Sequence, residues 1–274
     1  MKKKSQVGLM LLKEMFPRIN ELKDHVDFFQ VPAEEYYSRH GIEDLDTLQN
    51  ISKIKPLHIH SIDLSIGSED GISENYLNVL NTIHKNVKVV TYSDHIGFSR
   101  AGGLWTGMPI LNTILTNESI DVIVGNINKV LKVIKGSSFL IENNSHCIKW
   151  PGSKIAENKF SNSICRKTES KIILDIPNML ADARNFGFDP KKYIKGLDVD
   201  SVSMIHIAGG DWLDGYKENK ITRGHFKKVE EEVWDLLQYV FLHHVPRYVT
   251  LERSRNINIE EIIDELKKLR TICH

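Results

Sequence analysis

The sequence predicts an α/β fold, a single (β/α)8 barrel of the TIM type that spans residues 1–274. Three observations lead to it. Short apolar runs recur eight times, amphipathic segments separate them, and the chain has 274 residues. Strands buried on both faces of a parallel sheet read as continuous apolar runs. Eight such runs alternating with helices indicate a closed barrel, which typically takes about 250 residues.

The expected strands are rich in Val, Ile and Leu, and most of them lack polar alternation. In chain order they are Val7–Leu12, Val26–Val31, Pro56–Ser65, Val87–Ile96, Ser138–Asn143, Lys171–Asn178, Ser201–Gly209 and Tyr248–Glu252. A doubly wound open sheet is the alternative, but it usually has fewer strands and a Gly-rich phosphate turn after the first. The first run leads instead into the charged segment Lys13–Phe16.

Helices are expected between the strands. Apolar residues recur at spacings of three and four in four segments, namely Tyr76–His84, Ser119–Ile134, Lys227–Leu242 and Ile259–Leu269. The polar stretch Asp211–Gly224 follows the seventh strand. It is expected to be an irregular exposed loop on the active face, or part of a lid.

The composition bears on the partners, the cysteine chemistry and the location of the protein. The 36 basic and 36 acidic side chains balance, which gives no electrostatic reason to expect nucleic acid or an anionic membrane as a partner. Cys147, Cys165 and Cys273 lack CxxC spacing, so neither a disulfide framework nor a zinc–thiolate site is expected. The apolar start is too short for a signal peptide, and no run approaches the roughly 18 apolar residues of a membrane helix. A cytoplasmic location is expected.

Polar side chains stand at the carboxyl ends of six successive expected strands. In closed parallel barrels the active site forms at this end of the strands. Six candidate metal ligands are therefore expected to converge on one face: His60, His95, Glu142, Asp175, His206 and Glu252.

Each of these residues alone has an ordinary explanation, as a hydrogen-bonded core histidine or a carboxylate that caps a helix. These explanations do not suffice for all six residues together, because carboxylates that converge at a buried barrel mouth are costly without a compensating cation. Mixed imidazole and carboxylate ligation suits Fe(II), Mn(II) or Zn(II). Six ligands are too many for one catalytic ion with open positions. The sequence thus predicts two ions that share a bridging carboxylate.

Asn178 and His225 are further metal candidates. Asn178 lies three residues after Asp175 and either ligates a further ion or ends the strand. His225 follows the polar stretch and is expected to reach the cluster. His58 is expected in the barrel core, and His243–His244 are expected to be structural.

At these residues the chain resembles the multinuclear non-haem iron-dependent oxidative enzymes, whose barrel is of the xylose-isomerase type and whose usually cited member is the methanobactin-biosynthesis oxidase. The matching stretches occur in the family's order over roughly residues 56–253. They are His60–Ser68, Ser93–His95, Ile141–Ser153, Ile173–Ile194, Ile205–Gly210 and Thr250–Arg253. The family's metal ligands fall on the six residues already chosen.

The resemblance implies an oxidative enzyme with two irons, or three, and O2 as co-substrate. Relatives modify ribosomally made peptides, often at cysteine. The implied partners are a precursor peptide and a separate protein that captures the peptide leader. The implied mechanism has one Fe(II) bind the substrate thiolate and its neighbour bind O2.

The chain departs from the family at several positions. Asp94 stands where the family has Glu, and Thr106 lies where it has a carboxylate. Gly210 replaces a histidine, and Arg223 replaces an aspartate that helps to hold a third iron. An arginine repels a metal ion, so a two-iron core with a weakened or absent third site is expected. Arg184 and Arg223 either bind a substrate carboxylate or phosphate or lie at the surface.

Two other functions remain open from the sequence. The first is a divalent-metal sugar isomerase or an endonuclease-like enzyme on the same barrel. The balanced charge disfavours the nuclease, which needs a basic face. The second is a non-catalytic peptide-binding barrel. The metal content of the purified protein distinguishes these two functions from the oxidative enzyme.

Overall fold

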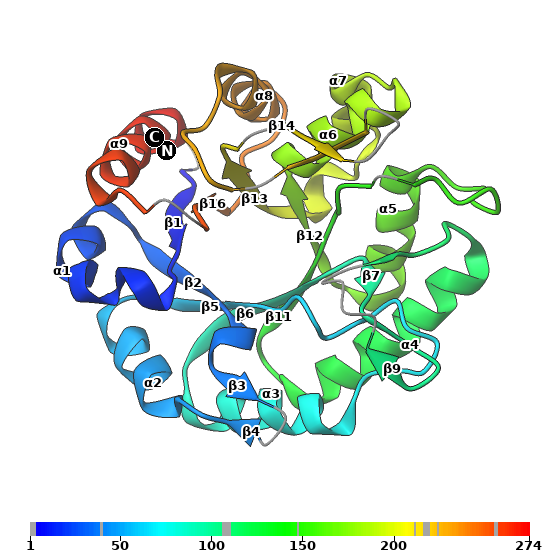
Figure 1. The fold of residues 1–274 in the computed structure, drawn as a ribbon, viewed down its shortest axis with the longest axis horizontal. Helices are drawn as coiled ribbons and strands as arrows, with labels where there is room; N and C mark the ends of the chain where they lie inside the picture. The colour runs from blue at the N-terminus through cyan, green and yellow to red at the C-terminus, as the bar shows by residue number, and fades with distance from the viewer. Residues whose placement is uncertain are drawn as a thin grey trace. The chain divides into compact units, whose positions relative to one another are not determined.

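Eight parallel strands form a closed barrel in this computed structural model, which confirms the predicted fold (Figure 1). The structure describes residues 4–38, 41–105, 111–146, 148–210, 212–215, 220–223, 225–254 and 257–274. The barrel order is β1-β16-β13-β12-β11-β6-β5-β2. The strands are β1 (Gln6–Met10), β2 (Phe28–Pro32), β5 (Leu57–His60), β6 (Val89–His95), β11 (Ser138–Glu142), β12 (Lys171–Asp175), β13 (Val202–Ala208) and β16 (Tyr248–Glu252).

Backbone contacts divide the chain into two compact units. The terminal unit comprises Met1–Phe29, Asn143–Lys149 and Ile173–His274, and the central unit comprises Gln30–Glu142 and Trp150–Ile172. Each unit carries part of the barrel wall and its own helices. The single-domain interpretation of the sequence stays a prediction.

In the central unit, β6 pairs in parallel with β5 on one side and β11 on the other. The helices are α2 (Leu45–Ile54), α3 (Glu74–Asn86), α4 (Asn117–Val133) and α5 (Glu157–Thr168), with the short 3₁₀ helix η3 (Ala33–Glu35). The small strands are β3 (Tyr37–Ser38), β4 (Gly41–Ile42), β7 (Gly97–Phe98), β8 (Arg100–Ala101), β9 (Leu104–Trp105) and β10 (Leu111–Asn112). Ser73 and Thr116 cap α3 and α4, because their side-chain oxygens accept backbone N–H groups of the first turn.

In the terminal unit, β16 pairs in parallel with β1 and β13. The helices are α1 (Ile19–Leu22), α6 (Ile176–Phe186), α7 (Pro190–Gly196), α8 (Glu231–Phe241) and α9 (Ile259–Cys273), with the 3₁₀ helices η1 (Lys13–Arg18), η2 (Lys23–His25) and η4 (Val199–Ser201). Strand β1 lies beside α9 (Figure 1), and just before it Ser5 N donates to Cys273 O at 3.4 Å.

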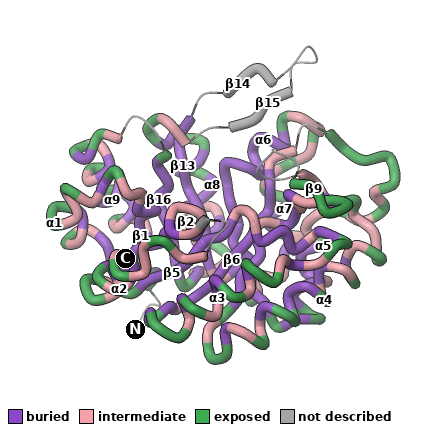
Figure 2. Tube along the Cα trace, turned by 60° about the horizontal axis from the view of Figure 1, so that its bottom comes forward, coloured by how far each residue is buried: buried purple, intermediate pink, exposed green. Residues whose placement is uncertain are grey.

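The barrel strands form the core, and Figure 2 shows the buried residues concentrated along them. Apolar residues such as Ile59, Ile141 and Leu251 are fully buried, as the apolar runs predicted. His58 is a core residue, also as predicted, and its Nδ1 lies 2.7 Å from Thr91 Oγ1. None of the described helices is long and apolar enough to cross a membrane.

Two expectations about elements were wrong. The run Lys171–Asn178 is not one strand, since α6 begins at Ile176 with Asp175 as its N-cap and Pro177 in its first turn. The stretch Asp211–Gly224 is not irregular throughout, because β14 (Trp212–Gly215) and β15 (Lys220–Arg223) pair as an antiparallel hairpin. Helix α5 was missed because its sequence is mostly polar.

Candidate metal centre

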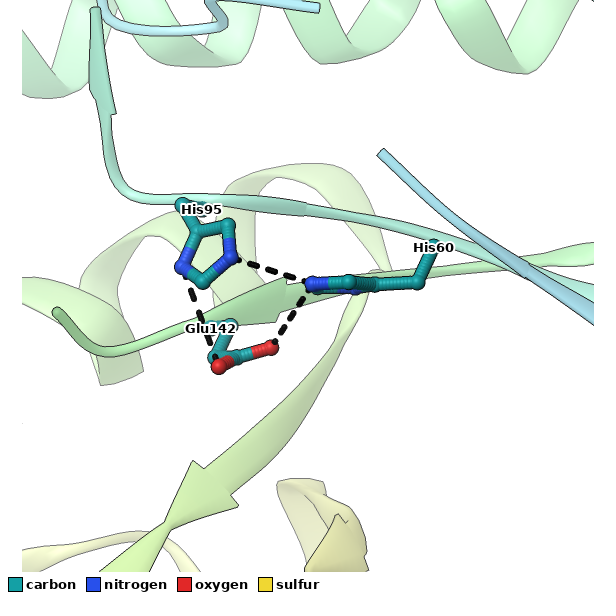
Figure 3. Close-up of side chains that lie close together, drawn as sticks. All are labelled: His60, His95 and Glu142. Atoms are coloured by element: carbon teal, nitrogen blue, oxygen red, sulfur yellow. Dashed lines mark hydrogen bonds and ion pairs between the residues drawn. The ribbon is translucent and has the colours of Figure 1, made fainter. Parts of the chain in front are cut away.

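Three predicted ligands meet in the central unit at the carboxyl ends of three neighbouring strands (Figure 3). His60 ends β5, His95 ends β6 and Glu142 ends β11. The strand register pairs Glu142 directly with His95. The Nε2 atoms of the two histidines lie 3.0 Å apart. Glu142 Oε2 is 3.5 Å from His60 Nε2, and its Oε1 is 3.7 Å from His95 Nδ1.

The orientation of His60 is set by a neighbour on the next strand. Its Nδ1 lies 2.9 Å from Ser93 Oγ, and that hydroxyl also lies 3.3 Å from Ile59 O. A hydrogen bond at one ring nitrogen directs the other nitrogen towards a metal and raises its basicity. Ser93 thus supports Nε2 of His60 as the ligand atom.

Two buried acids, Glu34 and Asp94, lie next to the segments that carry His60 and His95. Glu34 Oε1 accepts hydrogen bonds from Ile62 N at 2.7 Å and Asp63 N at 2.9 Å, so it anchors the segment that follows His60. Burial raises the pKa of Glu34, against the opposing effect of these bonds. Burial also raises the pKa of Asp94, which adjoins His95.

A second cluster lies within the terminal unit. One ligand atom from each of Asp175, His225 and Glu252 lies within 4.8 Å of the other two. His225 Nδ1 is 3.1 Å from Glu252 Oε2. On the other carboxylate oxygen, His206 Nδ1 is 3.0 Å from Glu252 Oε1, and the His206 side chain is fully buried. Four predicted ligands therefore gather in this unit.

Asp175 is held by an asparagine pair. Asn143 Oδ1 accepts from Asp175 N at 2.9 Å, and Asn143 Nδ2 donates to Asp175 O at 3.0 Å. Asn178 N donates to Asp175 Oδ1 at 2.5 Å, and Asn178 Nδ2 donates to Asn143 O at 3.1 Å. The amide nitrogen of Asn178 is thus engaged, which leaves its Oδ1 as the atom with ligand character.

The segment that carries His225 is fixed at both ends. Ser254 N donates to His225 O at 2.8 Å. Lys227 N donates to Gly209 O at 3.0 Å, and Gly209 packs so tightly that an added Cβ would lie 1.9 Å from Lys228 O. Further on, Val229 N donates to Glu265 Oε1 at 2.5 Å.

Arg253, the residue after β16, completes this support. Its Nη2 donates to Glu265 Oε2 at 2.5 Å, and its side chain is almost fully buried beside Glu252. Burial raises the pKa of Glu265, while the bonds from Val229 and Arg253 oppose the rise. A buried pair of this kind fixes geometry more than it adds stability.

Both clusters have the donor chemistry of a transition-metal site. Each combines imidazole nitrogen with carboxylate oxygen, a mixture that suits iron, manganese or zinc better than calcium or magnesium. The central cluster holds two histidines and one carboxylate, the set typical of non-haem Fe(II) oxygenases. Three protein ligands also leave positions open for substrate. The bridging carboxylate between two ions stays a prediction.

The remaining candidates fall outside these clusters. His244 Nε2 contacts Val202 O at 2.8 Å, and His243 packs edge-on against Tyr239, so both are structural as expected. Arg184 forms an exposed ion pair with Glu232, which favours the surface role. Thr106 and the side chain of Arg223 lie outside what the structure describes.

Sequence reasoning missed the supporting residues Ser93, Asn143, Glu34, Glu265 and Gly209. Of these, Asn143 is the one that the sequence could have indicated as a supporting residue, since it directly follows Glu142 at a strand end. The others act through partners distant in the sequence.

Residues 6–274 match the family described as the RiPP precursor modification enzyme MbnB/TglH/ChrH. Relatives described only as UPF0276 proteins include one from Rhizorhabdus wittichii, 29% identical over 250 residues that cover 91% of this chain and 87% of the relative. Another from Caulobacter vibrioides is 28% identical over 246 residues, with 89% and 85% covered.

Solved structures with the same barrel share little sequence with this chain. A xylose isomerase domain containing protein from Salmonella typhimurium superposes with a TM-score of 0.65 at 12% identity, over 100% of this chain and 99% of that one. Endonuclease IV from Thermus thermophilus gives 0.61 at 16% identity, over 97% and 98%. At such identities the likeness shows the fold alone.

Proposed function

The chain belongs to the RiPP precursor modification enzyme family MbnB/TglH/ChrH, and from that premise we propose an iron- and O2-dependent oxidase of a ribosomally made precursor peptide. We propose that the modified residue is a cysteine. Peptide modification is the family's shared activity. Iron, dioxygen and the cysteine target are the proposed refinements.

One observation carries the iron and O2 part of the proposal. His60, His95 and Glu142 form a set of two histidines and one carboxylate at the ends of adjacent strands. Protein sites of this composition with open positions are typical of Fe(II) enzymes that use O2. Zinc in hydrolytic sites takes three ligands too, so metal identity is the first quantity to measure.

The protein's own contribution is orientation and exclusion of water. Iron, when bound, supplies a site for the substrate thiolate and for reduction of O2. Ser93 holds the His60 ring through Nδ1. Glu142 is almost fully buried beside both histidines, and such burial strengthens electrostatic interactions in the site. In the terminal unit, Asn143 and Arg253 fix the backbone on which Asp175 and Glu252 stand.

We propose two irons, one for each three-ligand cluster. The proposed ligands are His60, His95 and Glu142 in one unit, and Asp175, His225 and Glu252 in the other, with His206 against Glu252. A third iron would draw on Asn178. Gly210 and Arg223 replace a histidine and an aspartate that the resembling family offers there, which is why two irons are proposed.

Metal content of paired variants tests this assignment. After anaerobic reconstitution with Fe(II), the wild-type protein is expected to hold about two irons per chain. Glu142→Ala and Glu252→Ala are each expected to keep about one, because each removes a ligand from a different cluster. His243→Ala, the matched control, is expected to keep both.

Other metal contents would favour one of the alternative functions. Zinc or magnesium alone would favour the isomerase or nuclease alternative, and no metal uptake would favour a non-catalytic peptide-binding barrel. Iron lost from His243→Ala but kept by Glu142→Ala would overturn the ligand assignment.

The substrate is tested with short cysteine-containing peptides encoded beside the gene, with and without a neighbouring leader-binding protein. O2 consumption and a mass change confined to the cysteine are expected from the iron-loaded protein. The same peptide with serine in place of cysteine is the control. Equal oxidation of both peptides would exclude cysteine as the target.

A further inference from the structure

Two loops of the central unit are bonded to each other at the carboxyl ends of its strands. The β5 loop, residues 61–70, follows His60, and the β6 loop, residues 96–105, follows His95. Three hydrogen bonds join the loops: Gly67 N donates to Gly97 O at 2.7 Å, Ser99 N to Ser65 Oγ at 3.0 Å, and Ser68 Oγ to Arg100 O at 3.0 Å. The loops therefore form one fixed platform that continues directly from two proposed metal ligands.

The β6 loop ends in a short hairpin that displays two large apolar side chains. Strands β8 and β9 pair around Gly102 and Gly103, whose φ angles of 60° and 75° fit a tight two-residue turn. Asp70 Oδ2 of the β5 loop accepts a hydrogen bond from Gly103 N at 2.8 Å, which holds the tip. Leu104 is 73% exposed and Trp105 is 58% exposed (Figure 2). Adjacent exposed apolar side chains on a fixed hairpin favour a binding surface.

A cavity of about 620 Å³ opens beside this hairpin. Its lining includes Tyr37, Asp63, Arg100, Leu104 and Trp105, which all belong to the central unit. The ring of Tyr37 packs edge-on against that of Tyr76, with 4.9 Å between the centroids, so one wall is held in place. Cavities of this size are typical of ligand sites. It has room for one peptide residue with a large side chain.

Asp63 and Arg100 give the cavity a hydrogen-bond acceptor and a donor side by side. Arg100 Nη2 lies 3.6 Å from Asp63 Oδ2, which is longer than a hydrogen bond. Ser99 Oγ donates to the other carboxylate oxygen and so fixes Asp63. The two charges balance, so the pair does not select a charged side chain. It matches a peptide group, whose C=O accepts and whose N–H donates.

We propose that this cavity is a subsite for the precursor peptide and takes an uncharged residue with a large apolar side chain. The backbone of that residue bonds to Arg100 and Asp63, and its side chain packs against Leu104 and Trp105. The inference rests on the peptide-modifying part of the proposed function, and it requires neither iron nor a cysteine target.

The chain fixes how far this subsite lies from the central cluster. Asp63 comes three residues after His60, so their Cα atoms are at most about 11 Å apart. An extended peptide covers that distance in about three residues. The apolar residue in the subsite is therefore expected within a few positions of the residue that is modified.

Tryptophan indole NMR signals of the full-length protein test the subsite. The chain has four tryptophans, and Trp105→Phe identifies the Trp105 signal. The probe is a capped pentapeptide with one phenylalanine between glycines. It is expected to shift the Trp105 signal saturably, with a Kd on the order of 1 mM. Peptides with aspartate, lysine or glycine at the central position are expected to bind at least about 10-fold more weakly, since each lacks the apolar contact.

Matched controls come from the same unit. Trp150 is also exposed but does not line this cavity, so its signal is expected to stay in place. Arg100→Gln is expected to weaken binding of the phenylalanine peptide about 10-fold, because the charged donor is lost. Arg166→Gln, at an exposed position of α5, is expected to equal wild type. If Arg100→Gln does not fold, the peptide series with the wild-type protein decides the outcome.

Three results would overturn the subsite. They are a Trp105 signal that the phenylalanine peptide does not move, an equal effect of the charged peptides, and a shift caused only by a neighbouring leader-binding protein. The oxidation assay judges the proposed function separately. A precursor that is oxidised while the Trp105 signal stays unmoved removes only the subsite. Peptide binding without oxidation removes only the iron and O2 chemistry.

Discussion

Asn143 illustrates what a single side chain contributes to this protein. Its amide forms a reciprocal pair of hydrogen bonds with the backbone of Asp175, and its own carbonyl receives Nδ2 of Asn178. One residue thus orients a proposed carboxylate ligand and a proposed amide ligand. Residues that hydrogen-bond to a metal ligand act by fixing the orientation of that ligand.

Replacing Asn143 by alanine is expected to weaken metal binding while leaving the barrel intact. Loss of a supporting residue typically costs about 10- to 100-fold in metal affinity, and that range is expected here for one of the two metals. Competition with a chromophoric chelator measures it. The control is Asn86→Ala at the exposed end of α3. Equal affinities for the two variants would contradict the role.

Among the elements, the segment after β5 depends on an acid from the 3₁₀ helix after β2. Glu34 of η3 binds the backbone of Ile62 and Asp63 and also accepts the hydroxyl of Tyr76 at 2.9 Å. Its folded pKa lies above the unfolded value because burial disfavours the charged form. Its effect on stability is therefore most favourable below about pH 4, near the unfolded pKa. It declines as the pH rises through the folded pKa.

Glu34→Gln is expected to remove this decline, because glutamine keeps an accepting oxygen without a charge. The difference in melting temperature between the variant and wild type is expected to grow in the variant's favour from pH 4.5 to pH 8. Thermal unfolding of the metal-free proteins measures it. The exposed Glu14→Gln is the control. A difference independent of pH would show that Glu34 has no raised pKa.

The segment that carries His225 requires a glycine at position 209. An added Cβ there would collide with the carbonyl of Lys228 at 1.9 Å. Gly209→Ala is expected to cost about 1–3 kcal/mol of stability, as overpacking does, and to lower metal content in the terminal unit. Denaturant unfolding and iron analysis measure both effects.

Gly125 provides the opposite case. It lies exposed within α4, and apart from its chain neighbours and the nearby backbone of its own helix no heavy atom lies within 4 Å of an added Cβ. Gly125→Ala is expected to stabilise the protein by about 0.5–1 kcal/mol, because glycine is a poor helix residue. If both alanine variants lose stability equally, the close contact at Gly209 is not the cause.

At the scale of the whole molecule, metal binding is expected to stabilise the fold, since both clusters need folded strands. A ligand at 100 times its dissociation constant adds about 2.7 kcal/mol. For a protein of this size that corresponds to about 5 °C or more in melting temperature. Calorimetry with and without Co(II) measures the shift. Glu142→Ala is expected to show a smaller one, and an unchanged wild-type temperature would argue against metal binding.

The sequence by itself determined the barrel and the strand ends at which the candidate ligands lie. Each buried strand has its own apolar run, and runs such as Tyr248–Glu252 coincide with the observed strand. The six ligands proposed from the apolar runs stand at or near strand ends, where parallel strands in a barrel all finish on one face. Both features are local in the chain, so both are visible without coordinates.

Only the tertiary structure decided what surrounds these candidate ligands. Helix α6 begins directly after Asp175 because that side chain caps it, although the apolar run continues. His146 meets Asp182 across 36 residues, and Glu34 meets Ile62 across 28. Such pairings depend on strand register and helix packing, which bring together residues that no local pattern connects.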